Sequence, residues 1–597
     1  MNQPTPAIVT QNAVRRLPRA TLLLLCAAYL LPGLVGRGPW KNVDISSFGF
    51  MAQLASGGQG MARWFDPMLL DWRPESSALM PYWIGAWAIQ LAPSWLRPDL
   101  AVRIAFALML WGTFSATWYA VYYLARTPRA QPVAFAFGGE ALPKDYARAV
   151  ADGGLLALLA CLGLAQLGHE TTPALSQLFF SSCLFYAVAA LPYRRIGPRI
   201  ALAVGALGTT LSGAPTLALG LGLGSLLIAW QQRRRGVNPA AADSAYNNTR
   251  VELLPEGTAA AYPRSAVLGI ALATCSAALL ALWLGLFHWN VMLPGMNAND
   301  RLIGDLRSSG KLLLWFTWPA WPLALWTLWR WRRQMTARHV ALPLLFALVP
   351  LVATLTTDFS DRSLLLGLPA LATLAAFALP TFRRSAAALI DWFTLLFFSG
   401  SAVTIWVIWI SLQTGVPAKP AANVARLAPG FVPEFQLLPF VFALAATLAW
   451  CWLVKWRTGR QRAALWKTLV LPAGGAALCW LLLMTLWLPA LDYGRSYAPQ
   501  MRAVAERVGQ PSCIAVLGLG RAHTGALRHH GHFMLKPLDK SAAASAACPW
   551  LLTTPMAAAQ LAAPDLAAQW RAAGTLRRPT NAADDLLLFQ HVSTAGQ

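Results

Sequence analysis

The sequence predicts an all-α, polytopic membrane protein that carries a small α/β domain at its C-terminal end. Three observations support this fold class. The 597 residues are 57% hydrophobic and only 12% charged, about half the charged share of an ordinary soluble domain. Long, nearly uncharged stretches recur along most of the chain, and the composition changes after residue 494. These features exclude a disordered chain, a coiled coil and a conventional cytosolic enzyme.

The apolar stretches are long enough to cross a bilayer, which takes about 20 residues of helix. We predict about 13 membrane-spanning helices. Their expected ranges are 20–36, 100–125, 151–167, 172–191, 198–211, 214–230, 265–287, 312–330, 339–357, 362–380, 388–412, 435–454 and 466–490. An odd number of spans places the two ends of the chain on opposite sides of the membrane.

The basic residues indicate which loops face the cytoplasm. The chain has 48 Lys and Arg against 24 Asp and Glu, a formal net charge of +24. Such a charge is typical of nucleic-acid-binding proteins, but also of membrane proteins, which collect Lys and Arg in cytoplasmic loops. Here the basic clusters lie in alternate loops, at 15–19, 126–148, 194–199, 233–235, 330–338, 383–384 and 455–467. We therefore expect a cytoplasmic N-terminus, and the nucleic-acid interpretation fails.

The first long segment on the outer side, residues 37–99, is amphipathic. Apolar side chains recur in it at helical spacing in two places. One stripe is Phe48, Met51, Leu54 and Ala55, and the other is Tyr82, Trp83, Trp87 and Leu91. We expect two helices that lie in the membrane interface.

The second long outer segment, residues 494–597, has a different composition. Short strand-like runs at 513–517, 550–554 and 586–589 alternate with Ala-rich stretches at 497–509 and 556–573. This alternation predicts a small α/β domain with helices over the Ala-rich stretches. The chain therefore divides into a membrane domain, 1–493, and an outer domain, 494–597.

Cysteine usage is consistent with this layout. Most of the 8 cysteines lie in apolar spans, where a thiol behaves as a small hydrophobic side chain. Cys513 and Cys548 instead each adjoin a predicted strand of the outer domain. An oxidising compartment permits a disulfide between them, but the spacing does not give the geometry. A disulfide and two free thiols are both consistent with the sequence.

Ionisable residues at the outer edge of the membrane domain are candidates for function, because they are costly to place near a bilayer. Carboxylates there can act as general bases or orient a nucleophile, and Arg and Lys can bind a phosphate. The alternative is that most of them are solvated loop charges. The candidates are Lys41, Asp44, Arg63, Asp66, Asp71, Arg73, Glu75, His169, Glu170, His288, Asp300, Arg301, Asp305, Arg307, Lys311, Asp358, Asp361 and Arg362.

Two further patterns in the outer domain have simple explanations. The glycines at 518, 520 and 525 follow a strand, but their spacing differs from that of a dinucleotide-binding loop, so we expect a turn. No acidic or Cys ligand pattern accompanies a cluster of histidines, which favours a solvated segment over a zinc site. These histidines are His523, His529, His530 and His532. We predict no metal site and no required cofactor, although a divalent metal ion is compatible with the carboxylates.

Several short motifs occur in a recognisable order. The run from Asp44 to Met51 (DISSFGFM) is followed by Trp64 and by the run from Glu75 to Trp83 (ESSALMPYW). Val102 to Phe106 (VRIAF) lies at the start of the second span, and Asp361 to Pro369 (DRSLLLGLP) opens a late one. In order, spacing and topology this chain resembles the ArnT and protein O-mannosyltransferase type of glycosyltransferase.

The resemblance implies a GT-C fold and a site on the outer face. It implies that Asp44 lies beside the acceptor nucleophile, as base or orienter, and that Glu170 is a second acid. The leaving phosphate needs cations, and the four within reach would be Arg301, Arg307, Lys311 and Arg362. The other substrate-binding residues that we expect are Glu75, Tyr82, Arg103, His169 and His288.

The chain departs from the family pattern at three places. Ile45 replaces the usual Glu after the Asp. The run Ser76-Ser77-Ala78 occupies the place of Lys-Pro-Pro, so the family's substrate-binding Lys is missing. Ser363 or Leu364 stands where a Tyr is common. The donor sugar and the acceptor therefore stay open.

We expect a glycosyltransferase of the bacterial inner membrane, with its active site and C-terminal domain in the periplasm. It would transfer a sugar from an undecaprenyl-phosphate-linked donor by an inverting single displacement. The acceptor would be lipid A, another cell-envelope glycan or a protein, and no nucleic acid takes part. The alternative is a transporter or flippase of lipid-linked saccharides. Such proteins tend to have two related halves with broken helices, and this sequence has no internal repeat.

Overall fold

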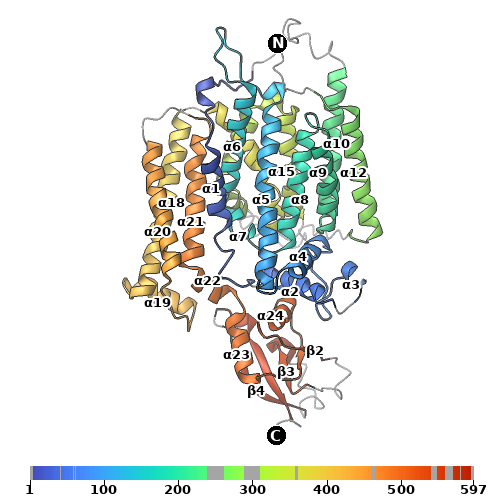
Figure 1. Cartoon of the computed structure of the whole chain (residues 1–597), viewed down its shortest axis with the longest axis vertical. Helices are drawn as coiled ribbons and strands as arrows, with labels where there is room; N and C mark the ends of the chain where they lie inside the picture. Colours follow the sequence, from blue (N-terminus) through green and yellow to red (C-terminus); the bar gives the residue numbers. More distant parts are fainter. Residues whose placement is uncertain are drawn as a thin grey trace, which may run out of the picture.

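The long apolar stretches fold into helices that stand side by side in one bundle, as Figure 1 shows. The computed structural model describes residues 5–40, 42–57, 60, 62–237, 261–287, 310–356, 361–382, 384–458, 464–538, 548–558, 569–578 and 580–592. Up to residue 495 its helices are α1 (Arg19–Leu30), α2 (Val43–Ala55), α3 (Ala62–Phe65), α4 (Met80–Leu91), α5 (Pro98–Ala125), α6 (Pro143–Ala160), α7 (Leu162–Leu167), α8 (Pro173–Ala190), α9 (Ile196–Leu211), α10 (Pro215–Val237), α12 (Arg264–Trp283), α14 (Ala320–Arg330), α15 (Arg338–Thr356), α16 (Asp361–Leu365), α17 (Leu368–Ala378), α18 (Arg384–Thr414), α19 (Ala418–Leu427), α20 (Leu437–Thr458), α21 (Lys467–Leu486) and α22 (Leu488–Arg495).

The bundle is that of a multi-pass membrane protein. Among the described residues, seven helices are long and apolar enough to cross a membrane: α5, α8, α12, α15, α18, α20 and α21. Shorter apolar helices, including α1, α9 and α17, lie in the same bundle. The predicted span 151–167 is divided, because α6 ends at Ala160 and α7 begins at Leu162. The number of membrane-spanning helices, about 13, stays a prediction.

Small residues let neighbouring helices of the bundle approach closely. Where α8 crosses α9, a Cβ atom on Gly205 would lie only 2.6 Å from the backbone nitrogen of Leu184. One polar contact inside the bundle joins α5 to α6, where the Trp118 indole donates a hydrogen bond of 2.8 Å to Asp152. A closely packed bundle of this kind is a firm support for the loops at its ends.

The first outer loop lies at the end of the bundle opposite the N-terminus (Figure 1). Both predicted helices are present, as α2 and α4. On α4, Trp87 and Leu91 are exposed, as expected for an interface helix. In contrast, Phe48 and Met51 of α2 are buried, because α2 packs between α4 and the helix α24 (Arg521–His530) of the C-terminal domain. Of these two helices, only α4 therefore presents apolar side chains outward, at Trp87 and Leu91.

The C-terminal domain is a five-stranded mixed sheet with short helices. The strand order is β2-β1-β3-β5-β4; β1 is parallel to β2 and β3, and β5 is antiparallel to β3 and β4. Its elements are α23 (Ala498–Val508), β1 (Ile514–Leu517), α24 (Arg521–His530), β2 (Leu535–Pro537), β3 (Trp550–Thr553), α25 (Pro555–Ala558), β4 (Trp570–Leu576) and β5 (Leu586–His591). The three predicted strands and the helix at 497–509 are confirmed.

The predicted helix at 556–573 is wrong in its last part. Only α25 is helical among its described residues, and β4 begins at Trp570. The strand is favoured because Trp570 and Leu576, at its two ends, are buried, while pairing with β5 satisfies the backbone between them. Tertiary pairing thus overrides the helix propensity of the two alanines at 572 and 573.

A disulfide joins Cys513 and Cys548, with their Cα atoms 5.0 Å apart. Cys513 directly precedes β1 and Cys548 lies two residues before β3, and these strands are neighbours in the sheet. This observation decides between the two alternatives that the sequence left open.

Helix α24 docks on α2 at a point where both helices carry glycine. A Cβ on Gly525 would lie 2.9 Å from the carbonyl oxygen of Ile45, and one on Gly49 would lie 3.1 Å from the Cα of Gly525. The Ile45 side chain belongs to the same apolar core as α23 and α24. The segment 523–530 is therefore a docked helix, and the prediction of a solvated segment is wrong there.

Candidate functional site

Asp44 lies in the first turn of α2, at the end of the bundle that faces the C-terminal domain. It is only 2% exposed. Its Oδ1 accepts hydrogen bonds from the backbone N–H (2.8 Å) and hydroxyl (2.7 Å) of Thr171, and its Oδ2 accepts one from the backbone N–H of Trp40 (2.9 Å). A carboxylate at the start of a helix is also favoured by the helix dipole. The Asp44 carboxylate is therefore fixed and strongly hydrogen-bonded.

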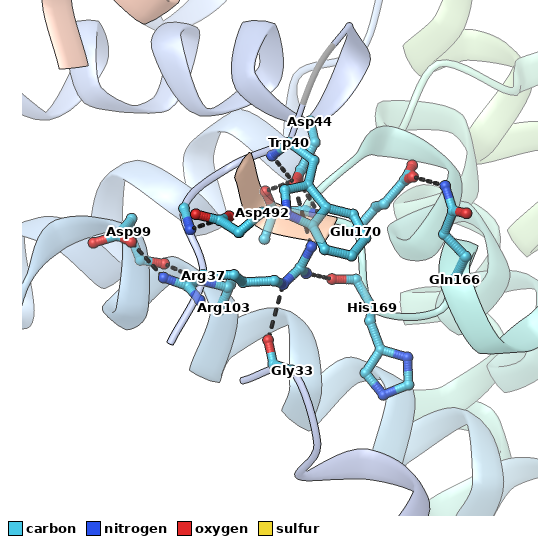
Figure 2. Close-up of polar contacts among 12 residues, drawn as sticks. Gly33, Arg37, Trp40, Asp44, Asp99, Arg103, Gln166, His169, Glu170 and Asp492 are labelled. Atoms are coloured by element: carbon cyan, nitrogen blue, oxygen red, sulfur yellow. Dashed lines mark hydrogen bonds and ion pairs between the residues drawn. The ribbon is translucent and has the colours of Figure 1, made fainter. Parts of the chain in front are cut away.

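Arg37 is the buried counter-ion of Asp44 (Figure 2). Its guanidinium lies 3.9 Å from Asp44 Oδ2, and both side chains are 3% exposed. Arg37 also donates hydrogen bonds to the backbone carbonyls of Gly33 (2.8 Å) and His169. The arginine thus ties the end of α1, the start of α2 and the turn before α8 together.

Glu170 is a second buried carboxylate, in the turn between α7 and α8. Its Oε1 accepts a hydrogen bond of 3.0 Å from Gln166. Burial raises the pKa of Glu170, and the negative charge of Asp44 raises it further, against the opposing effects of Gln166, Arg362 and Arg37. A carboxylate with a raised pKa binds a proton more readily at neutral pH, which suits a general base.

Arg362 comes to Glu170 from a distant part of the chain. The two residues are 192 positions apart, yet Arg362 Nη2 lies 3.4 Å from Glu170 Oε2. The Arg362 side chain, on the short helix α16, is 34% exposed, whereas that of Glu170 is 8% exposed. Arg362 therefore presents a partly accessible cation beside a buried carboxylate.

Helix α22 closes the site from the side of the C-terminal domain. Asp492 accepts hydrogen bonds from the backbone N–H of Gly38 (3.1 Å) and from the Trp40 indole (3.0 Å). Burial raises the pKa of Asp492, whereas these hydrogen bonds lower it. Asp492 thereby holds the segment that leads from Arg37 to Asp44.

Arg103 and His169 lie on the inner side of this cluster. Arg103 is buried and bonds to Asp99 and to the backbone carbonyl of Leu34 (2.8 Å). The His169 ring points away from the two catalytic candidates (Figure 2), with its nitrogens 2.6 Å and 3.0 Å from the carbonyls of Ala165 and Tyr29. Burial lowers the pKa of His169 to about 4. Both residues line a cavity of about 10 Å³, roughly the room that one water needs.

Glu75 and Tyr82 lie where the first outer loop meets the C-terminal domain. The exposed Glu75 pairs with Arg521 of α24 at 3.5 Å. Tyr82 is buried against Phe50, at 5.4 Å between ring centroids, and burial raises the pKa of its hydroxyl. Among the described residues, neither of them forms a hydrogen bond or ion pair with Asp44 or Glu170.

The remaining residues that we expected to bind substrate belong to the 288–311 loop. His288, Arg301 and Arg307 lie outside the described residues. Lys311 is described, and its side chain is exposed. Within the described ranges, no group of three or more His, Cys, Asp and Glu side chains is arranged to hold a metal ion.

Sequence reasoning missed several residues of the cluster. Arg37 and Trp40 closely precede Asp44, and their position beside a candidate acid was the available signal. Gln166 lies four residues before Glu170 and Thr171 directly follows it. This closeness in sequence is a weaker indication that they belong to the site. No sequence pattern indicated Asp492, because it follows the last span and reaches the site only through folding.

These features define a GT-C-type membrane protein in fold: a helix bundle, outer-loop helices over one end, a buried acid at the start of the first of them, and a small α/β domain beyond. In particular, the chain is similar over nearly its whole length to ArnT from Cupriavidus metallidurans. The structure of that protein bound to undecaprenyl phosphate matches with a TM-score of 0.57 and 13% sequence identity, covering 96% of this chain and 97% of ArnT.

The apo structure of the same ArnT matches with a TM-score of 0.55 and 14% identity, over 96% of this chain and 98% of ArnT. No family model matches the chain, and no curated protein matches it by sequence. At these identities the likeness establishes a shared fold.

Proposed function

We propose that this protein is a glycosyltransferase that uses a polyprenyl-phosphate-linked sugar as donor. The observation that carries the proposal is the pairing of Glu170 with Arg362 beside the fixed Asp44 carboxylate. A transferase of this kind needs a base for the acceptor and a cation for the departing phosphate, and these groups fit both needs. The shared fold with an ArnT solved with undecaprenyl phosphate supports the same class of donor.

In the proposed reaction, an acceptor hydroxyl attacks the anomeric carbon of the donor sugar in one step. The new carbon–oxygen bond forms as the bond to the lipid phosphate breaks, so the configuration inverts. The acceptor proton passes to Glu170, and the phosphate leaves with the bonding electron pair. Asp44 orients the reacting groups, because its oxygens already accept three hydrogen bonds. Arg362 stabilises the charge on the leaving phosphate.

The assay for this proposal uses purified protein in nanodiscs with an undecaprenyl-phosphate sugar and candidate acceptors. Release of undecaprenyl phosphate together with a glycosylated acceptor is expected. A flippase would leave the donor intact, so the absence of any cleavage or transfer across lipid A, envelope glycan and protein acceptors would contradict the proposal. Mass spectrometry of lipid A and lipid-linked sugars from a deletion strain selects the acceptors to test.

Arg362→Lys tests the phosphate assignment. Arg grips two phosphate oxygens with a planar fork, whereas Lys offers a point charge. We expect the lysine variant to need a higher donor concentration while its expression and thermal stability stay near normal. An unchanged dependence on donor concentration would assign Arg362 to a structural role as the partner of Glu170.

We also propose that the site and the C-terminal domain face the periplasm of a bacterial inner membrane. The N-terminus and the C-terminal domain lie at opposite ends of the bundle (Figure 1), which fits a chain that crosses the membrane an odd number of times. The disulfide in the C-terminal domain fits an oxidising compartment.

A further inference from the structure

Arg495 is a half-buried cation at the last residue of α22, next to the candidate site. Its guanidinium lies over the indole ring of Trp40, 5.1 Å from the ring centroid. Arg37 lies over the same ring at 4.5 Å. Because the Trp40 indole is itself held by Asp492, the position of Arg495 relative to the Asp44 segment is well defined.

The charge of Arg495 has no partner of its own in the part of the chain that the structure describes. It forms no ion pair and donates no side-chain hydrogen bond there, in contrast to Arg37 and Arg362. Burial lowers the pKa of Arg495, Glu170 raises it and Arg37 lowers it. Arg495 therefore lies within electrostatic reach of Glu170, with donors left for an anion.

The C-terminal domain fixes the backbone that carries Arg495. Arg578 donates a hydrogen bond of 3.2 Å to the carbonyl oxygen of Arg495, and the Thr580 hydroxyl donates one of 2.8 Å to that of Gly494. Arg578 is in turn paired with Asp584 at 2.5 Å. The placement of Arg495 thus depends on the docked domain as well as on the bundle.

We propose that Arg495 is a second phosphate-binding residue for the polyprenyl-phosphate donor, supplied by the junction between the bundle and the C-terminal domain. The inference rests on the proposed function and extends it. Arg362 of α16 pairs with Glu170 at 3.4 Å, and Arg495 of α22 lies over Trp40, whose backbone N–H binds Asp44. Two guanidinium groups from different parts of the chain therefore lie beside the cluster that holds the two buried carboxylates. Two cations suit a leaving phosphate better than one, because its negative charge grows as the bond to the sugar breaks.

The test measures binding of undecaprenyl phosphate to the full-length protein in nanodiscs. We expect Arg495→Gln to weaken binding by about 10-fold to 100-fold, the range for losing one charge-assisted hydrogen bond. Arg495→Lys should lose less, because it keeps the charge and the contact with Trp40. Arg502→Gln is the matched control: it removes an exposed arginine on α23 and should bind like the wild type.

The outcomes separate the inference from the proposed function. If Arg362→Gln loses affinity and Arg495→Gln does not, the inference is overturned and the proposed function stands. If the wild-type protein does not bind undecaprenyl phosphate, both are overturned. Arg495→Met keeps an unbranched side chain over Trp40, and it replaces Arg495→Gln if melting curves show that the glutamine variant is unfolded.

Discussion

At the scale of single residues, the two buried carboxylates differ in how their oxygens are satisfied. Asp44 accepts three hydrogen bonds and lies beside Arg37. Glu170 accepts one hydrogen bond from Gln166 and a longer one from Arg362. These environments fit the proposed roles, in which Asp44 orients the reacting groups and Glu170 accepts the proton.

The pH dependence of turnover tests the role of Glu170. Burial raises the pKa of Glu170 above the usual range of a glutamate side chain, and only the charged form can accept a proton. Turnover should therefore fall on acidification, with a midpoint above the usual pKa range of a glutamate side chain. Gln166→Met removes a hydrogen bond that lowers this pKa, so it should move the midpoint to higher pH. An acid limb that Gln166→Met leaves in place would speak against Glu170 as the base. Glu170→Gln should reduce turnover by about 10²–10⁴-fold.

A double-variant experiment tests Asp44. Asp44→Asn removes the charge that faces Arg37, and leaving one member of a buried pair alone costs about 3 kcal/mol or more. We therefore expect Asp44→Asn to lower both thermal stability and turnover. Adding Arg37→Gln removes the uncompensated charge and should recover part of the stability, measured by melting in detergent. Turnover should stay low in the double variant; its recovery along with stability would reduce Asp44 to a purely structural residue.

At the scale of elements, the crossing of α24 over α2 links the C-terminal domain to the helix that carries Asp44. Gly525→Ser would place a side chain against the carbonyl oxygen of Ile45, 2.9 Å from the new Cβ. The substitution is intrinsically favourable inside a helix by about 0.5 kcal/mol, so any loss comes from the crossing. We expect faster proteolysis between the two domains and reduced turnover. Gly520→Ser is the control, because a Cβ there meets open space and serine is a good N-cap; equal effects of both variants would refute the close packing.

The sequence was informative about elements that carry their own periodicity. The apolar runs, the stripes of α2 and α4, and the strands β1, β3 and β5 could all be predicted, because each is a local pattern. β4 could not, since pairing with β5 decides it. In the site, Asp44, Glu170 and Arg362 could be named from motifs and loop position. Asp492 and Arg495 could not, because only the folding of α22 back toward Trp40 brings them near.

At the scale of the whole molecule, the docked C-terminal domain and the first outer loop form one cap over the end of the bundle. Trp72 of the loop donates a hydrogen bond of 2.9 Å to the carbonyl of Leu519, and Arg521 of the domain contacts the loop in return. The cap must therefore lie on a single side of the membrane. A structural disulfide is typical of an oxidising compartment, so the proposed orientation of the chain can be tested through its thiols and through fusions.

We predict that both parts of the cap lie outside the cytoplasm. Reporter fusions at Ser56 and at the C-terminus should both read as external. In cells with a permeabilised outer membrane, a membrane-impermeant maleimide should label Cys513 and Cys548 only after a reducing agent has been added, because the disulfide protects them. The control is a chain with both cysteines replaced by serine, which should show no labelling that depends on reduction. A cytoplasmic reading from either fusion would contradict the proposed orientation. The Glu170–Arg362 pair would then lie on the cytoplasmic side of the membrane.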